Sequence, residues 1–297
     1  MENFDTITIN VVWLTDLINH YMPILDEVCI ASWQVNNPKY KIILWTNDER
    51  LKLNLLSKDT TEIKIIQNDL MSFVENITFE TKDTMKLAHQ ADIIRYSILE
   101  QCGGITLDAD VFCISPLEDL INRMNKENKS IVFGYEDNCR IGIALMSNLN
   151  NDGKQFYCDI LSHYSTHYVK TSWLYNSIKY PMLLKNRYKD KILELPAGEN
   201  WHYPNGLGDE CSNLSNITPL FELEMPENFR GYGIHLYSNP KKWREYKLYL
   251  ETNLYIKGPN DFWLLKNMNV IIDKYIDLMC KSNYRELSVN PITMEPF

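Results

Sequence analysis

Apolar positions in the N-terminal part of the chain follow two alternating patterns. Short apolar runs rich in β-branched residues predict buried strands, and longer segments with apolar residues three or four positions apart predict helices. Gly103 follows the second such helix, at the position where a left-handed residue commonly ends a helix. Alternating strands and helices predict an α/β fold with a parallel sheet covered by helices. Strands are predicted over 7–14, 40–45 and 62–67, a fourth short strand is predicted to follow Gly103-Gly104 and to end at Leu107, and helices are predicted over 23–35 and 83–101. Thr46-Asn47-Asp48 is predicted to cap a further helix.

The remaining sequence is less regular. Strands are predicted over 131–135 and 141–146, and helices over 155–169, 174–187 and 261–280. The last helix is amphipathic, with these residues predicted to face inward: Leu264, Ile271, Tyr275 and Leu278. We find no internal repeat or low-complexity linker. We therefore predict a principal α/β domain over residues 1–250 and a helical extension over 251–297 that packs on the same domain.

Composition and charge exclude several classes of function. The chain has 297 residues, of which 45% are hydrophobic and 23% charged, as in an ordinary soluble protein with ample core. Its formal charge of −9 argues against binding nucleic acid through bulk electrostatics. Seven cysteines without metal-binding spacing indicate free thiols in a reducing compartment. The sequence predicts neither a signal peptide nor a transmembrane segment, so we expect a cytoplasmic protein. A peripheral membrane location and export as an effector stay open.

Two carboxylates follow the predicted short strand that ends at Leu107. Asp108 and Asp110 would lie at the carboxyl end of that strand, where open α/β sheets bind ligands. Asp-x-Asp alone is more often a solvated turn, but its place directly after an apolar strand and Gly103-Gly104 favours a metal site. Carboxylate oxygens suit Mg²⁺ and Mn²⁺, and such an ion can neutralise a diphosphate leaving group.

A third acidic residue and an arginine lie on the helix that precedes this strand. Asp92 and Arg95 are three positions apart, on one side of the helix. Taken alone, this spacing predicts a surface ion pair of little energetic value. Beside a metal site, Arg95 could bind phosphate or sugar oxygens with its planar fork, and Asp92 could accept from sugar hydroxyls. Metal, arginine and carboxylate together predict a site for a sugar diphosphate.

These segments resemble the DXD signature of glycosyltransferase family 32, and are similar to the glucosylating domain of the large clostridial toxins. The resemblance is strong over residues 7–115, thin over 116–245 and absent beyond. It is carried by Asp92–Arg95, Gly103-Gly104 and Leu107–Asp110. Further similar segments are Val11–Trp13, Ala31–Trp33, Asn37-Pro38, Ile43–Trp45, Tyr180-Pro181, Trp201–Pro204, Ile234–Ser238 and Trp243. Departures from the family pattern are Thr106 in place of Tyr, Gly142 near a frequent Asn, and a longer spacing before Trp243.

The resemblance implies a GT-A fold and a retaining, metal-dependent transferase. Such an enzyme moves a hexose or N-acetylhexosamine from a nucleotide sugar, expected to be a UDP-sugar, to a hydroxyl group. The acceptor would be a glycan, a lipid-linked glycan or a protein, most simply in glycan or surface-polysaccharide synthesis. The cofactor would be Mn²⁺ or Mg²⁺.

The same resemblance implies roles for individual residues. Asp92, Arg95 and Asp110 are expected to be catalytic, and His235 is expected to join Asp108 and Asp110 as a metal ligand. The donor would contact Trp13, which stacks on the nucleobase, together with Asp92, Arg95, Asp108, Ser238 and Trp243. Without the resemblance, a Trp on a buried strand is ordinarily a core residue and a lone His in a strand ordinarily packs.

Three alternatives stay open at this point. The first is an effector glycosyltransferase that modifies a host protein. The second is a phosphatase of the haloacid dehalogenase type, in which the first Asp of Asp-x-Asp is the nucleophile; Gly208-Asp209-Glu210 does not complete the second motif of that class. The third is a sugar-binding module without turnover.

Overall fold

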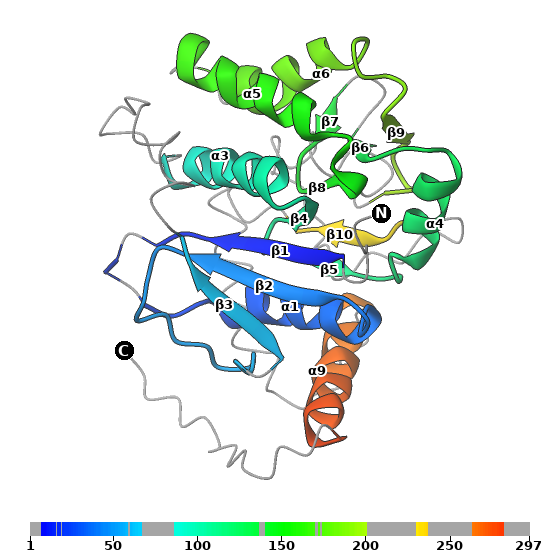
Figure 1. Ribbon diagram of the computed structural model, residues 1–297. Helices are drawn as coiled ribbons and strands as arrows, with labels where there is room; N and C mark the ends of the chain where they lie inside the picture. Colours follow the sequence, from blue (N-terminus) through cyan, green and yellow to red (C-terminus); the bar gives the residue numbers. More distant parts are fainter. Residues whose placement is uncertain are drawn as a thin grey trace, which may run out of the picture.

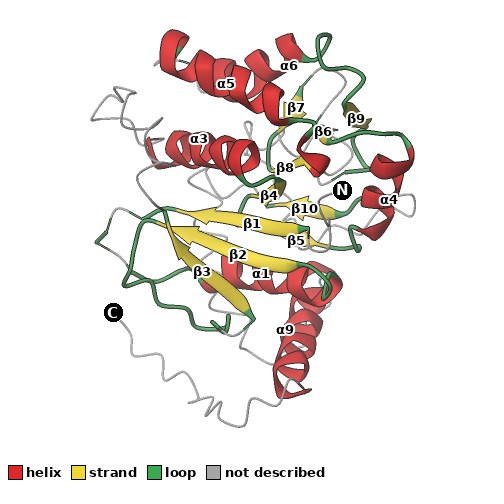
Figure 2. Ribbon diagram, in the orientation of Figure 1, coloured by secondary structure: helices red, strands yellow, loops and turns green. Residues whose placement is uncertain are grey.

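The computed structural model describes residues 7–66 apart from 16, 19 and 59, residues 86–200 apart from 137–139, 170, 171 and 173, and residues 230–236 and 263–281. Within these residues, a central sheet carries helices on both faces (Figures 1 and 2). The α/β class predicted from the sequence is confirmed. No helix in the described ranges is long and apolar enough to cross a bilayer.

The central sheet has five strands in the order β3-β2-β1-β4-β8. Four of them run parallel, and β8 pairs antiparallel with β4 at one edge. Their bounds are β1 Thr8–Trp13, β2 Lys41–Thr46, β3 Thr61–Ile65, β4 Gly104–Leu107 and β8 Leu145–Asn148. The predicted parallel sheet is therefore confirmed.

The single strand predicted over 141–146 is wrong. The segment divides into β7 (Ile141–Gly142), which pairs with β6 (Ile131–Tyr135), and β8, which pairs with β4 in the central sheet. Ile143 and Ala144 lie between them, where the chain leaves one sheet for the other. A periodicity of apolar residues does not reveal such a change of partner, because both strands are buried. β9 (Ile192–Leu195) completes the three-stranded sheet, in parallel with β6.

Helices α1 (Ile24–Asn36) and α3 (Lys86–Gln101) lie on opposite faces of the central sheet (Figure 1). α9 (Trp263–Lys281) packs on α1, and α5 (Lys154–His167) packs on α3. Because α3 lies between the sheet and α5, its residues from Asp92 to Leu99 are all buried. The helix predicted over 83–101 is confirmed over its described residues, 86–101, and the structure adds that it is buried between two layers.

The helix predicted over 174–187 is also wrong as a single α-helix. The structure has a π-helical turn at Tyr175–Lys179, followed directly by α6 (Tyr180–Leu184). The helix predicted after Asp48 is absent from the described residues of 49–60. There, the carboxylate of Asp48 accepts the backbone N–H of Arg50 (2.9 Å), which caps a turn.

The C-terminal helix begins and ends close to its predicted limits. Ile271 and Tyr275 are buried as expected, whereas Leu278 is half-buried and Met279 is buried instead. The side chain of Leu264 lies outside the described residues. α9 contacts α1, while the division of the chain at residue 250 stays a prediction.

Glu27, on α1, holds the loop at residues 54–56 through hydrogen bonds. Its buried carboxylate accepts the backbone N–H groups of Asn54 (2.8 Å), Leu55 (2.6 Å) and Leu56 (2.9 Å). We expect Glu27→Gln to lower the free energy of unfolding by about 2–3 kcal/mol. The glutamine side chain replaces one acceptor oxygen with an NH2 group, which would face the backbone N–H groups of the loop and leave a buried donor without an acceptor. Urea unfolding measures the loss, and the exposed Glu118→Gln is the control. Equal stability of Glu27→Gln and the wild-type protein would contradict this role.

Candidate active site

The paired aspartates lie directly beyond the carboxyl end of β4. Gly103 and Gly104 both have left-handed backbone angles, φ +68° and +85°. A Cβ atom on Gly104 would lie 2.7 Å from the carbonyl oxygen of Thr8, so only glycine allows β4 to start against β1 there. After Leu107, the N–H of Asp108 donates to the carbonyl of Ala144 (2.8 Å). The glycines and the break between β7 and β8 therefore fix the position of the first aspartate.

A distant strand brings a histidine to the aspartates. β5 (Val111–Cys113) pairs antiparallel with β10 (Gly233–His235), with His235 opposite Val111. The Nε2 atom of His235 lies 3.3 Å from Oδ1 of Asp110 and 3.8 Å from Oδ2 of Asp108. One ligand atom from each of the three side chains lies within 4.8 Å of the others.

The donor set of this cluster fits a divalent cation. Burial raises the pKa of Asp108 to about 6, although the charges of Arg95 and His235 oppose that shift. Burial alone would lower the pKa of His235, but Asp110 and Asp108 raise it. Two close carboxylates and an imidazole offer oxygen and nitrogen ligands of the kind that Mn²⁺ accepts, and carboxylate oxygens that Mg²⁺ accepts.

Asp92 and Arg95 lie behind the cluster and not on the surface. Their side chains are 5% and 2% exposed, so the alternative of a surface ion pair is wrong. The guanidinium of Arg95 contacts Asp92 through Nη2 (2.5 Å) and Asp108 through Nη1 (2.5 Å). Nη1 also donates to the carbonyl of Ile143 (3.0 Å). Arg95 therefore joins helix α3, the aspartates and the β7–β8 break.

Trp13 is the last residue of β1, at the same edge of the sheet. Val11 pairs with Leu107, so Trp13 lies beyond the end of β4, level with the segment that carries the aspartates. Its side chain is partly exposed and packs against the core. Among the described residues, its indole N–H is buried and has no hydrogen-bond partner. This placement is compatible with the predicted contact to a nucleobase.

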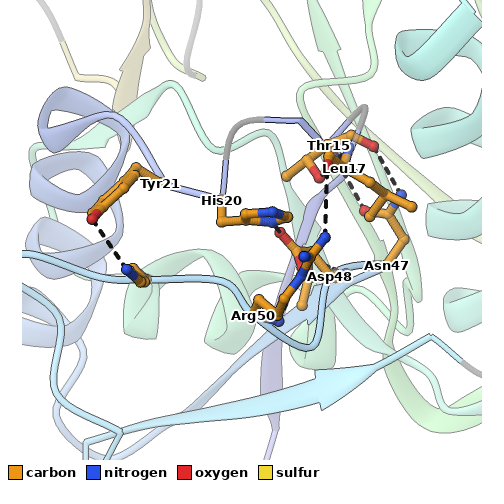
Figure 3. Close-up of polar contacts among 9 residues, drawn as sticks. Thr15, Leu17, His20, Tyr21, Asn47, Asp48 and Arg50 are labelled. Atoms are coloured by element: carbon orange, nitrogen blue, oxygen red, sulfur yellow. Dashed lines mark hydrogen bonds and ion pairs between the residues drawn. The ribbon is translucent and has the colours of Figure 1, made fainter.

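Hydrogen bonds join the loops that follow β1 and β2 to each other (Figure 3). The N–H of Thr15 donates to Asn47 Oδ1 (2.9 Å), and Asn47 Nδ2 donates to the carbonyl of Thr15 (2.9 Å). His20 pairs with the buried Asp48. The sequence signalled Asn47 and Asp48 only as capping residues, because nothing local indicates their partners more than twenty residues away.

Asp48 gives this junction a pH dependence. Burial alone would raise the pKa of Asp48, but hydrogen bonds from His20 and the Arg50 N–H, and the charges of both residues, lower it. A lowered folded-state pKa stabilises the protein above the ordinary carboxyl value of about 4 and ceases to do so as the pH falls through the folded value. We therefore expect the melting-temperature gap between wild-type protein and Asp48→Asn to be full at pH 6 and to shrink below about pH 4. A gap that does not change with pH would contradict this contribution.

Several predicted residues lie outside the described part of the structure. They include two predicted donor contacts, Ser238 and Trp243, and the segment Trp201–Pro204. Conversely, sequence reasoning missed the carbonyl groups of Ile143 and Ala144 and the hydroxyl group of Ser177, which accompany the predicted residues in the site. Backbone carbonyls carry no sequence signal.

The paired aspartates of an Asp-x-Asp motif thus lie at the carboxyl end of a parallel strand, the edge where open α/β sheets bind ligands. Residues 24–130 match the family described as "Glycosyltransferase sugar-binding region containing DXD motif". The matched segment includes Asp92, Arg95, Asp108 and Asp110. The resemblance predicted from the sequence is confirmed over this region.

Other comparisons give more distant similarities. The chain is 27% identical over 114 residues to "Subversion of eukaryotic traffic protein A" of Legionella pneumophila, a match that covers 35% of this chain and 17% of that protein. Among solved structures, galactosyltransferase LgtC has a TM-score of 0.46 at 8% identity, over 89% of this chain and 95% of its own. Glycosyltransferase GlyE of Streptococcus pneumoniae has a TM-score of 0.46 at 13% identity, over 92% and 64%.

Proposed function

We propose that the protein is a metal-dependent glycosyltransferase that retains the configuration of the transferred sugar. The donor is a nucleotide sugar, most simply a UDP-sugar, and the transferred group is a hexose or N-acetylhexosamine. The observation that carries the proposal is the cluster of Asp108, Asp110 and His235, held against the buried Arg95 inside the matched DXD region.

The residues of the cluster have separable tasks in this proposal. Asp108, Asp110 and His235 would hold Mn²⁺ or Mg²⁺, which when bound supplies a Lewis acid for the diphosphate group. Arg95 holds Asp108 in place through a buried ion pair. Trp13 offers a partly exposed ring at the same edge of the sheet for the nucleobase. Ser238 and Trp243, from the segment after β10, are proposed to contact the donor.

The acceptor is a hydroxyl group of a glycan, a lipid-linked glycan or a protein. A surface polysaccharide is the first candidate, as the resemblance to family 32 implies. The similarity to a Legionella protein whose name refers to subversion of eukaryotic traffic supports a second candidate, a protein of a eukaryotic host. We propose a cytoplasmic location for the first case and export for the second.

A donor-hydrolysis assay tests the proposal without an acceptor. The protein is incubated with Mn²⁺ and single UDP- and GDP-sugars, and the released nucleotide is measured. We expect release from one donor or a few related donors, its loss with EDTA, and its recovery with Mn²⁺. Release of inorganic phosphate from phosphate esters would instead favour the phosphatase alternative. Donor binding without release, from any sugar, would favour the inactive module.

A further inference from the structure

Ser177 contacts the side chain behind the candidate active site. Its hydroxyl group donates to Oδ2 of Asp92 (2.7 Å), while Oδ1 of Asp92 contacts Arg95. Ser177 is fully buried. It therefore begins a continuous series of contacts that runs from Ser177 through Asp92 and Arg95 to Asp108.

The directions of the hydrogen bonds in this series follow from counting protons. Ser177 has one hydroxyl proton, and the Asp92 carboxylate can only accept it. The hydroxyl group of Tyr164 lies 3.0 Å from Ser177 Oγ, so Tyr164 must donate to Ser177. Tyr164 is buried as well. Each group in the series thus has one orientation, which fixes the Asp92 carboxylate relative to Arg95.

The backbone around Ser177 departs from an α-helix in a way that serves these contacts. The N–H of Tyr180 donates to the carbonyl of Tyr175, which closes the wider π-helical turn. Pro181 has no N–H group, so the carbonyl of Ser177, four residues earlier, cannot receive an α-helical hydrogen bond from it. The hydroxyl group of Tyr96 on α3 donates to that carbonyl instead (3.2 Å). The hydroxyl and carbonyl groups of Ser177 therefore both contact α3, the helix that carries Asp92 and Arg95.

We propose that Ser177 is a positioning residue of the glycosyltransferase site, and that the π-helical turn exists to hold it against Asp92. This inference rests on the proposed function. Ser177 does not contact the donor in this proposal: it orients Asp92, which orients Arg95, which holds Asp108 beside Asp110 and His235. Loss of the hydroxyl group frees the Asp92–Arg95 pair to rotate and displaces Asp108.

Ser177→Ala tests the proposal, and Ser97→Ala is its matched control. Ser97 lies on α3 and, like Ser177, is fully buried. Its hydroxyl group, however, donates to the carbonyl of Ile93 in its own helix (3.1 Å). We expect Ser177→Ala to lower both the Mn²⁺ affinity and the kcat of donor hydrolysis roughly tenfold, the lower end of effects for groups that orient metal ligands. KM for the donor should change less. Ser97→Ala should change neither quantity.

Two further variants separate positioning from stability. Tyr164→Phe keeps the Ser177 proton on Asp92 and should lower kcat less than Ser177→Ala does. In an Asp92→Asn background, adding Ser177→Ala should cause little further change in Mn²⁺ affinity or kcat, because the two substitutions interrupt the same series of contacts. Additive effects of Ser177→Ala and Asp92→Asn, or an Mn²⁺ affinity and kcat equal to those of Ser97→Ala, would overturn the proposal.

The inference and the proposed function fail differently. If the wild-type protein binds Mn²⁺ but hydrolyses no donor, the proposed function fails, and the tenfold difference in Mn²⁺ affinity between Ser177→Ala and Ser97→Ala still decides the role of Ser177. If the wild-type protein turns over donor and Ser177→Ala does so equally well, only the inference fails. A wild-type protein that binds no divalent cation would overturn both.

Discussion

Asp110→Asn is expected to lower the rate of Mn²⁺-dependent donor hydrolysis at least about 100-fold. Replacing a residue that only orients a metal ligand lowers metal affinity or activity by about 10- to 100-fold, and Asp110 is a proposed ligand itself. The substitution removes one of two carboxylates that lie within reach of His235. In the protein without metal, it also removes repulsion between Asp108 and Asp110, which offsets the lost contact with His235. We therefore expect the melting temperature without metal to shift by at most about 3 °C, which corresponds to roughly 1 kcal/mol.

Asp108→Asn should behave differently from Asp110→Asn in one respect. Asp108 also binds the buried guanidinium of Arg95, so its neutral replacement should lower stability as well as turnover. The exposed Asp119→Asn, on α4 (Glu118–Lys126), is the control for loss of a negative charge.

The decisive measurement is melting with and without Mn²⁺ plus nucleotide: wild-type protein should be stabilised and Asp110→Asn should not. An active Asp110→Asn enzyme would remove the basis for a metal site here.

The part of the fold that the sequence predicted is the part that local signals determine. β1, β2 and β4 are short apolar runs, and Gly103 and Gly104 mark a backbone that only glycine adopts readily. Because these strands and β3 run parallel, their carboxyl ends share one edge of the sheet. Asp108 and Asp110 could therefore be assigned to a ligand-binding edge from their position alone.

Contacts between distant segments account for what the sequence left open. His235 reaches the aspartates because β10 pairs with β5, and no local pattern encodes a pairing across that separation; only the family resemblance pointed to this residue. Burial of α3 on both sides depends on α5, which begins more than fifty residues after Asp92. An Asp–Arg pair looks the same in sequence on a surface and in a core. Ser177 could not be recognised because its role depends on a π-helical turn, which has no reliable signature.

Arg95→Lys is expected to reduce both stability and turnover, although it keeps the positive charge. The guanidinium fork of Arg95 binds Asp92, Asp108 and the carbonyl of Ile143 at once. A lysine ammonium group is a point charge on a flexible chain and cannot reproduce this planar geometry. We expect the free energy of unfolding to fall by about 1–3 kcal/mol, the range for a lost hydrogen bond to a charged group or an unsatisfied buried one.

The activity of Arg95→Lys should fall by more than its stability explains. At a temperature where the variant is fully folded, we expect kcat of donor hydrolysis to decrease about 10- to 100-fold, because Asp108 loses the group that holds it beside Asp110. Arg123→Lys is the matched control: Arg123 is exposed, its Nε contacts Glu127 four residues later on the helix (3.0 Å), and its replacement should cost less than about 0.5 kcal/mol. Wild-type kcat in folded Arg95→Lys would show that Arg95 stabilises the core without serving the site.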